Sequence, residues 1–123
     1  MIHVKSLTKT FGELKAVDGV SFDVQAGEIF AFLGPNGAGK TTTIQMLTTL
    51  LRPSDGSVTV DGMDPVAKPL EVRRRFGIVF QDPSLDSELT AYENMNLHGV
   101  LYHVPRRVRA ERIELLMKVF ELW

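Results

Sequence analysis

The sequence contains no cysteine and no long apolar run, and its charges nearly balance. The lack of cysteine excludes disulfide scaffolds, thiolate metal sites and cysteine nucleophiles. No apolar stretch approaches the roughly 18 residues that suggest a membrane span. The first residues, MIHVKSLTKTFGELK, alternate apolar and polar side chains, so they lack the continuous apolar core of a secretory signal. We therefore predict a cytoplasmic chain whose membrane role, if it has one, comes through a partner.

Composition is that of an ordinary globular protein. The 123 residues are 44% hydrophobic and 24% charged, which is enough apolar material for a core. Fourteen basic residues against fifteen acidic ones leave a net charge of -1, so nothing favours a nucleic-acid partner. The run Arg73–Arg75 is interpreted as a solvated helix face. His3, His98 and His103 share no spacing typical of metal ligands.

Alternation of apolar and polar residues predicts strands in the first part of the chain. Residues 2–24 alternate on both sides of the turn GELK, which indicates an antiparallel pair. Ser57–Gly62 alternates as well. Two wholly apolar stretches, Ile29–Leu33 and Phe76–Gln81, are typical of strands buried on both faces, as in a parallel sheet.

Helical spacing is found at other positions. It predicts helices over Lys40–Leu51 and Pro65–Arg75, then from Thr90, where Thr90 and Glu93 can form a capping box, and from Pro105 onward. The last helix carries an apolar stripe to the final residue, through Ile113, Leu116, Val119, Phe120 and Trp123. Because no C-cap residue and no polar tail follow, we expect the chain to end inside a larger domain.

The stretch GPNGAGKTTT matches the pattern G-x-x-x-x-G-K-[ST] between a predicted strand and a predicted helix. Its glycines permit backbone angles and close approaches that turn successive N–H groups toward phosphate oxygens. The helix that follows adds its own unpaired N–H groups. Lys40 would reach the β- and γ-phosphates, the Thr41 hydroxyl would complete the shell of a Mg²⁺ ion, and Thr42 would touch the α-phosphate. The loop members predicted to bind phosphate are Gly34, Pro35, Asn36, Gly37, Ala38, Gly39, Lys40, Thr41 and Thr42; the alternative is a glycine-rich turn with a chance Lys-Thr.

A longer match surrounds this loop. The stretch FLGPNGAGKTTTIQMLTTLLRPSDGSVTVDG resembles the first half of an ABC-transporter nucleotide-binding domain, and GIVFQD resembles the Q-loop of that family. LTKTF before AVDGVSF is similar to its A-loop, and LDSELTAYENM to the drug- and antibiotic-export branch. The resemblance covers the whole chain and implies an α/β P-loop NTPase fold: residues 1–28 as an antiparallel β-subdomain, 29–82 as the P-loop core with part of a parallel sheet, and 83–123 as the start of a helical subdomain.

The resemblance also assigns residues outside the loop. Phe11 would stack on adenine, where the family more often has Tyr, and Val17 would pad the ribose or base side of that pocket. Gln81 would reach the Mg²⁺ ion, beside Thr41, and a water near the γ-phosphate. The alternatives are that Phe11 is a core aromatic and that Gln81 is a strand-end amide satisfied by backbone.

Hydrolysis needs more than these residues. A second strand ending in a metal-holding Asp, a catalytic Glu and the signature that closes over a partner's ATP are absent from the sequence, and the resemblance places them beyond Trp123. The parent protein is thus expected to be an ATPase subunit that dimerises with a second nucleotide-binding domain and powers export by a membrane permease. Residues 1–123 are expected to hold Mg²⁺ and ATP without hydrolysis, and to self-associate through an exposed apolar edge.

Three alternatives remain at this point. ABC-type ATPases that work on DNA or the ribosome usually carry long insertions before the Q-loop, whereas Gln81 follows Lys40 by only 41 positions. A GTPase would need D-x-x-G and N-K-x-D, and neither is present. A naturally short ATP-binding module that does not hydrolyse ATP is the third.

Overall fold

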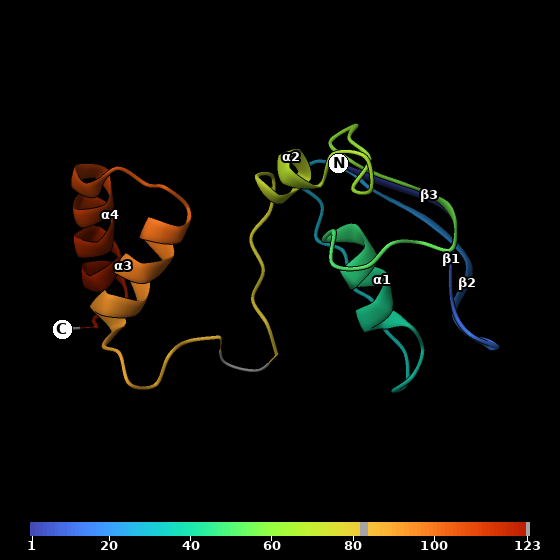
Figure 1. The fold of residues 1–123 in the computed structure, drawn as a ribbon, viewed down its shortest axis with the longest axis horizontal. Helices are drawn as coiled ribbons and strands as arrows, with labels where there is room; N and C mark the ends of the chain where they lie inside the picture. Colours follow the sequence, from blue (N-terminus) through green and yellow to red (C-terminus); the bar gives the residue numbers. More distant parts are fainter. Residues whose placement is uncertain (82–83, 123) are drawn as a thin grey trace. The chain divides into compact units, whose positions relative to one another are not determined.

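The chain forms two compact units, described here from a computed structural model that covers residues 1–81 and 84–122. The first unit is Met1–Ile78 and the second is Val79–Trp123. Figure 1 shows a sheet with one longer helix in the first unit and a pair of helices in the second.

The sheet has three strands in the order β2-β1-β3. They are β1 (Ile2–Phe11), β2 (Leu14–Val24) and β3 (Asp55–Val60), and β1 pairs antiparallel with both neighbours. The alternating pattern of residues 2–24 is therefore confirmed as two strands, and that of residues 57–62 is confirmed up to Val60, after which Asp61 and Gly62 form a turn. Gly56 lets β3 approach β1 closely, because a Cβ there would collide with the carbonyl of Ser6.

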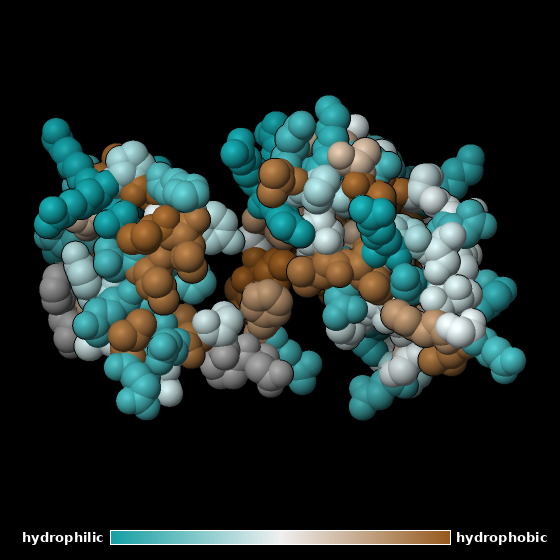
Figure 2. Space-filling view, in the orientation of Figure 1, coloured by the Kyte–Doolittle hydropathy of each residue, from teal (hydrophilic) through white to brown (hydrophobic). Residues whose placement is uncertain are grey.

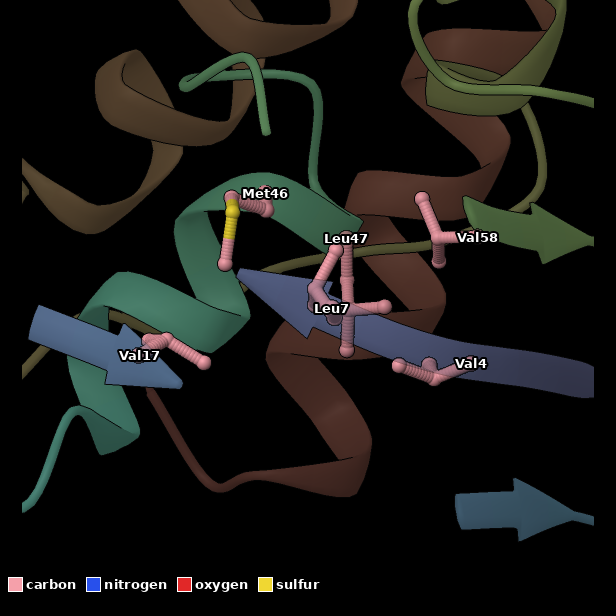
Figure 3. Close-up of a cluster of buried hydrophobic side chains, with 6 residues drawn as sticks. All are labelled: Val4, Leu7, Val17, Met46, Leu47 and Val58. Atoms are coloured by element: carbon pink, nitrogen blue, oxygen red, sulfur yellow. The ribbon is translucent and has the colours of Figure 1, made fainter. Parts of the chain in front are cut away.

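One helix covers one face of this sheet. The helix α1 (Lys40–Leu47) places Met46 and Leu47 on the apolar side chains of the strands. Figure 3 shows the cluster that results, and two of its members, Leu7 and Met46, are fully buried. Its members come from all three strands and from α1: Val4, Leu7, Val17, Met46, Leu47 and Val58.

The predicted strands Ile29–Leu33 and Phe76–Gln81 are wrong, because both stretches are irregular. Within residues 1–81 and 84–122 neither has a partner strand, and no parallel pair is formed. Phe30 and Phe32 pack their rings against Phe22 of β2, with centroids 5.1 Å apart in both cases. Ile29 and Leu33, at the two ends of the first stretch, are 98% and 92% exposed. The apolar run 29–33 was expected to be buried on both faces. Instead, its aromatic residues pack on Phe22, while Ile29 and Leu33 remain exposed.

The predicted helices Lys40–Leu51 and Pro65–Arg75 form over shorter ranges. α1 ends at Leu47, and the chain then turns through Thr49, whose φ is 66°. The N–H of Leu50 donates to the carbonyl of Gln45 at 2.9 Å and closes this turn. α2 (Pro69–Arg73) is a single short helix that buries Val72.

The second unit is a helix pair, α3 (Ala91–Leu101) and α4 (Arg106–Val119). The capping box of Thr90 and Glu93 is confirmed at the start of α3. Ile113 and Met117 are the buried members of α4.

The predicted apolar stripe of α4 is only partly buried. Leu116, Val119 and Phe120 are 41%, 64% and 65% exposed. The helix also ends at Val119, where Glu121 turns left-handed with φ of 53° and the N–H of Leu122 donates to the carbonyl of Met117, so the prediction of a helix up to the last residue is wrong. Trp123 lies outside the described residues.

Candidate phosphate-binding loop

The glycine-rich loop Gly34–Gly39 joins the stretch Ile29–Leu33 to α1, and two of its glycines are required by geometry. Gly37 and Gly39 have φ of 83° and 82°, in the left-handed region that other residues rarely adopt. A Cβ on Gly39 would also collide with the carbonyl oxygen of Ala16 and come within 3.1 Å of the Val17 side chain. Gly39 therefore lets the start of α1 lie directly on β2.

The first turn of α1 keeps its donors available. No side chain caps the helix at Gly39, and no acidic residue occupies the first turn. The N–H of Thr43, the fourth residue of α1, donates to the carbonyl of Gly39 at 2.9 Å. The amides of residues 40–42 precede the first intrahelical bond, and the positive end of the helix dipole lies at the same place. This is a suitable environment for an anion.

Lys40 places its ammonium group inside the loop. Its Nζ donates to the carbonyl oxygens of Gly34 at 2.6 Å and of Pro35 at 2.7 Å. An ammonium group has three protons to donate, so one remains for a phosphate oxygen. The loop is also closed by its own turn, in which the N–H of Ala38 donates to the carbonyl of Pro35 at 3.2 Å.

The three threonines after Lys40 differ in exposure. Thr41 is exposed and Thr42 is half-buried. Thr43 is buried, and its hydroxyl donates to the carbonyl of Gly39 at 2.9 Å. Thr41 and Thr42 thus lie at the open end of the loop, while the roles assigned to them toward Mg²⁺ and the α-phosphate stay predictions.

Phe11 and Val17 come from neighbouring strands of the same unit. Phe11 ends β1 with 49% of its surface exposed, and the Nζ of Lys9 lies 5.1 Å from its ring centroid. Val17 is 4% exposed and belongs to the core cluster beneath α1. Phe11 therefore offers a ring to solvent, and Val17 supports Gly39. Their predicted contacts with adenine and ribose stay predictions.

Gln81 is exposed and belongs to the second unit. The loop belongs to the first unit, as do Phe11 and Val17, and within this unit Val17 contacts the loop at Gly39. The predicted place of Gln81 near the γ-phosphate stays a prediction, and the residues that follow it, Asp82 and Pro83, lie outside the described part of the chain.

Sequence patterns missed three residues that shape these regions. Ala16 supplies the backbone on which Gly39 rests, Thr43 ties the first turn of α1, and Asn94 organises the segment before α3. The backbone contact of Ala16 leaves no mark in its own sequence. Thr43 and Asn94 have a signal, since each is a polar residue on the inward face of a predicted helix.

Other candidate sites are absent from the described residues. Residues 1–81 and 84–122 contain no group of three His, Cys, Asp or Glu side chains that could hold a metal ion. His3 instead bonds Asp23 through Nδ1 at 2.7 Å. Within the same ranges, every helix is too short or too polar to cross a membrane.

Comparison with known proteins agrees with the loop. A protein-family model described as ABC transporter matches residues 17–122. The daunorubicin resistance ATP-binding protein DrrA3 of Streptomyces coeruleorubidus is 45% identical over 116 residues, which are 94% of this chain and 37% of that protein. The ABC transporter ATP-binding protein NatA of Bacillus subtilis is 45% identical over 108 residues, or 87% of this chain and 44% of that protein. The chain thus spans less than half the length of these relatives.

Solved structures show the same relationship. The ATP-binding cassette MJ0796, crystallised as a dimer with ADP and Pi, superimposes with a TM-score of 0.80 at 29% identity, covering 100% of this chain and 58% of that one. A structure described as an ATP-binding subunit of an ABC transporter gives a TM-score of 0.82 at 31% identity, covering 99% of this chain and 51% of that one. The family model matches most of this chain, including the glycine-rich loop. The chain therefore belongs to the ABC transporter family.

Proposed function

We propose that residues 34–42 bind the phosphates of Mg²⁺-ATP, with Phe11 stacked on the adenine, Val17 beside it and Gln81 near the γ-phosphate. Lys40 carries this proposal. Its ammonium group bonds to two carbonyls of the loop, and the first turn of α1, which has no side-chain cap, follows it directly. No acidic side chain occupies the first turn of α1 to compete for these donors, so they favour an anionic ligand such as a polyphosphate.

In a cell, the protein would act as the ATP-binding subunit of an exporter. It would pair with a second nucleotide-binding domain, sit at the cytoplasmic face of the membrane through a permease subunit, and supply the energy for transport. The drug-resistance name of DrrA3 and the dimeric structure of MJ0796 support this proposal. Gln81 would sense the γ-phosphate through the metal ion or its water.

Residues 1–123 should bind ATP without turning it over. A loop and a Lys position the phosphates, but hydrolysis also requires a metal-holding Asp on another strand and a group that orients the attacking water. The sequence has no apolar strand followed by Asp-Glu. We therefore propose binding as the activity of this chain by itself.

Calorimetric titration of the chain with Mg²⁺-ATP tests this. Lys40→Ala removes the charge in the loop and should weaken ATP binding by about tenfold or more, since charge-assisted bonds contribute about 1.5 to 3 kcal/mol. Lys5→Ala is the matched control, because Lys5 is an exposed lysine of the same unit whose side chain makes no bond within the described residues. Equal affinity in the wild type and the Lys40→Ala variant would contradict the proposal, and phosphate release above background that Lys40→Ala abolishes would contradict the absence of turnover.

A further inference from the structure

Asn36 and Gly37 form an exposed turn within the glycine-rich loop. The N–H of Ala38 donates to the carbonyl of Pro35 at 3.2 Å and closes the turn around them. Gly37 has a φ of 83°, and a Cβ placed on it would meet no atom within 4 Å beyond its chain neighbours. In the part of the chain that the structure describes, no hydrogen bond holds the Asn36 side chain. This side chain can therefore turn toward the backbone nitrogen of Gly37.

The other asparagines of the chain have different surroundings. The sequence contains only three, and Asn36 alone is followed by glycine. Asn94 is 6% exposed, and its amide is bonded to the backbone of Asp86 through both Oδ1 and Nδ2. Asn96 is half-buried and accepts a bond from Arg109 Nε at 2.7 Å. Both lie within α3, whose backbone bonds also hold the N–H that follows each of them.

Asparagine is a thermolabile residue, because its side chain can react with the backbone nitrogen that follows it. Hydroxide removes the amide proton of Gly37, and the nitrogen attacks Cγ of Asn36, so that a new N–Cγ bond closes a succinimide ring. The Cγ–Nδ2 bond breaks, and Nδ2 leaves as ammonia with a proton from water, which restores the hydroxide. Water then opens the ring at either carbonyl and leaves aspartate or isoaspartate. Glycine favours the attack because no side chain crowds its nitrogen.

We propose that Asn36 is a site of spontaneous deamidation, with water as the only co-reactant, and that the modified loop loses affinity for polyphosphate. The exposure of Asn36 and the open space around Gly37 carry the first part. The second part rests on the proposed function, whereas the first does not.

The new carboxylate would lie next to a backbone group that Lys40 contacts. Lys40 Nζ donates to the carbonyl of Pro35 at 2.7 Å, and Asn36 is the next residue. The first turn of α1 has no acidic residue, so a carboxylate in the loop would be the first to attract the ammonium group and to repel phosphate. Isoaspartate also carries the main chain through its Cβ, which adds one atom to the backbone of the turn that Ala38 closes. Both products should therefore weaken binding of Mg²⁺-ATP.

Peptide mapping by mass spectrometry tests the modification on the folded chain, aged near pH 7 and near pH 9. The peptide that contains Asn36 should gain about 1 Da, the difference between an NH and an O, and gain it faster at the higher pH because hydroxide starts the attack. Asn94 and Asn96 should gain this mass at least about tenfold more slowly, since α3 must open before they react. Aspartates that precede glycine can isomerise without a change of mass, so they do not contribute to the gain.

Asn36→Gln and Gly37→Ala are the variants that block the reaction. Glutamine keeps the amide on a longer stem that closes a ring less readily, and alanine crowds the attacking nitrogen. Each should remove most of the mass gain at residue 36, while the control Asn96→Gln should leave the rate at Asn36 unchanged. If Gly37→Ala does not fold because of its left-handed backbone, Asn36→Gln provides the comparison by itself.

Calorimetric titration of fresh and aged chain with Mg²⁺-ATP tests the effect on binding. The wild type should lose binding sites in proportion to its deamidated fraction, and Asn36→Gln should keep through ageing whatever affinity it has when fresh. A folded chain whose Asn36 gains mass no faster than Asn94 and Asn96 overturns the modification. Aged, deamidated chain that binds as well as fresh chain overturns its effect. Absence of binding by fresh chain would overturn the proposed function and with it the effect on binding, while the mass gain still decides the modification.

Discussion

At the scale of single residues, the loop depends on two glycines that look alike in the sequence but have different surroundings. Gly37 and Gly39 share a left-handed backbone, with φ of 83° and 82°. A Cβ on Gly37 would meet open space, whereas a Cβ on Gly39 would collide with the carbonyl oxygen of Ala16. Gly37 is needed only for its backbone conformation. Gly39 is needed for its conformation and also because the backbone of Ala16 leaves no room for a side chain.

Alanine at each of these glycines separates the two requirements. Gly37→Ala should destabilise the chain by about 1 to 2 kcal/mol, which is the penalty for a left-handed non-glycine residue. Gly39→Ala carries that penalty and must also push α1 away from β2, so its loss of unfolding free energy should be clearly larger. Urea denaturation of both variants measures the difference. Equal losses would mean that the start of α1 does not rest on β2.

The carboxylate of Glu93 stabilises the start of α3 through the capping box with Thr90. Bonds from the backbone N–H of Thr90, and then from its hydroxyl, hold the pKa of Glu93 below its usual value of 4.5. The ionised form is therefore favoured by folding, and its contribution is present above the unfolded pKa and lost as the pH falls through the folded value.

Helicity near pH 3 and near pH 6 tests this link. As the pH falls from 6 to 3, the wild type should lose stability, and the part due to Glu93 should be lost below a pH of about 4.5. Glu93→Gln should lose less stability, because its amide does not titrate. Thermal unfolding followed at 222 nm gives the comparison. Glu88→Gln is the control, since the Glu88 carboxylate makes no bond within the described residues. If Glu88→Gln altered the pH dependence of stability as much as Glu93→Gln does, the role assigned to Glu93 would be contradicted.

At the scale of secondary-structure elements, the sequence predicted those whose partners are local. The antiparallel pair β1 and β2 follows from alternation around one turn, and α3 follows from its own capping box, so neither depends on distant chain. Ile29–Leu33 was mispredicted as a strand because a strand exists only where another strand bonds it. The sequence pattern shows apolar character but does not show which neighbour provides the hydrogen bonds.

Within the candidate site too, local features could be predicted from the sequence and contacts between distant residues could not. The loop from Gly34 to Thr42 could be predicted because glycine angles and a helix start are local properties, and the structure reproduces both. The support from Ala16 could not, because it is a backbone contact between residues far apart in the chain. The crossing of α3 and α4 is a similar case: Arg109 crosses over Gly99 to reach Asn96, since a Cβ on Gly99 would collide with the Arg109 stem.

At the scale of the whole molecule, both units keep large apolar side chains at their surfaces. In the first unit Ile29 and Leu33 are almost fully exposed, and in the second Val79 is 100% exposed. Figure 2 shows apolar side chains on the visible surface of each unit. Exposed apolar surface of this kind favours association.

We predict that the chain self-associates in a concentration-dependent way, partly through Ile29 and Leu33. Replacing both by Ser removes two exposed apolar side chains and leaves the edge-to-face rings of Phe30 and Phe32 in place. Sedimentation of the wild type and the double variant over a hundredfold range of concentration measures the change, and Val20→Ser is the control, a less exposed apolar residue of the same unit. A wild type that remains monomeric throughout would contradict this prediction.

The bonds from Lys40 to its own loop have a consequence for the rate at which a nucleotide would bind. The ammonium group bridges the carbonyls of Gly34 and Pro35, so these bonds by themselves hold the loop in a curved conformation. If residues 34–42 bind nucleotide as proposed, an arriving nucleotide would meet a loop that is already curved and would not wait for the backbone to rearrange. Encounter should therefore be limited by diffusion and charge rather than by a conformational step, and differences in affinity among related nucleotides should appear in how long each remains bound.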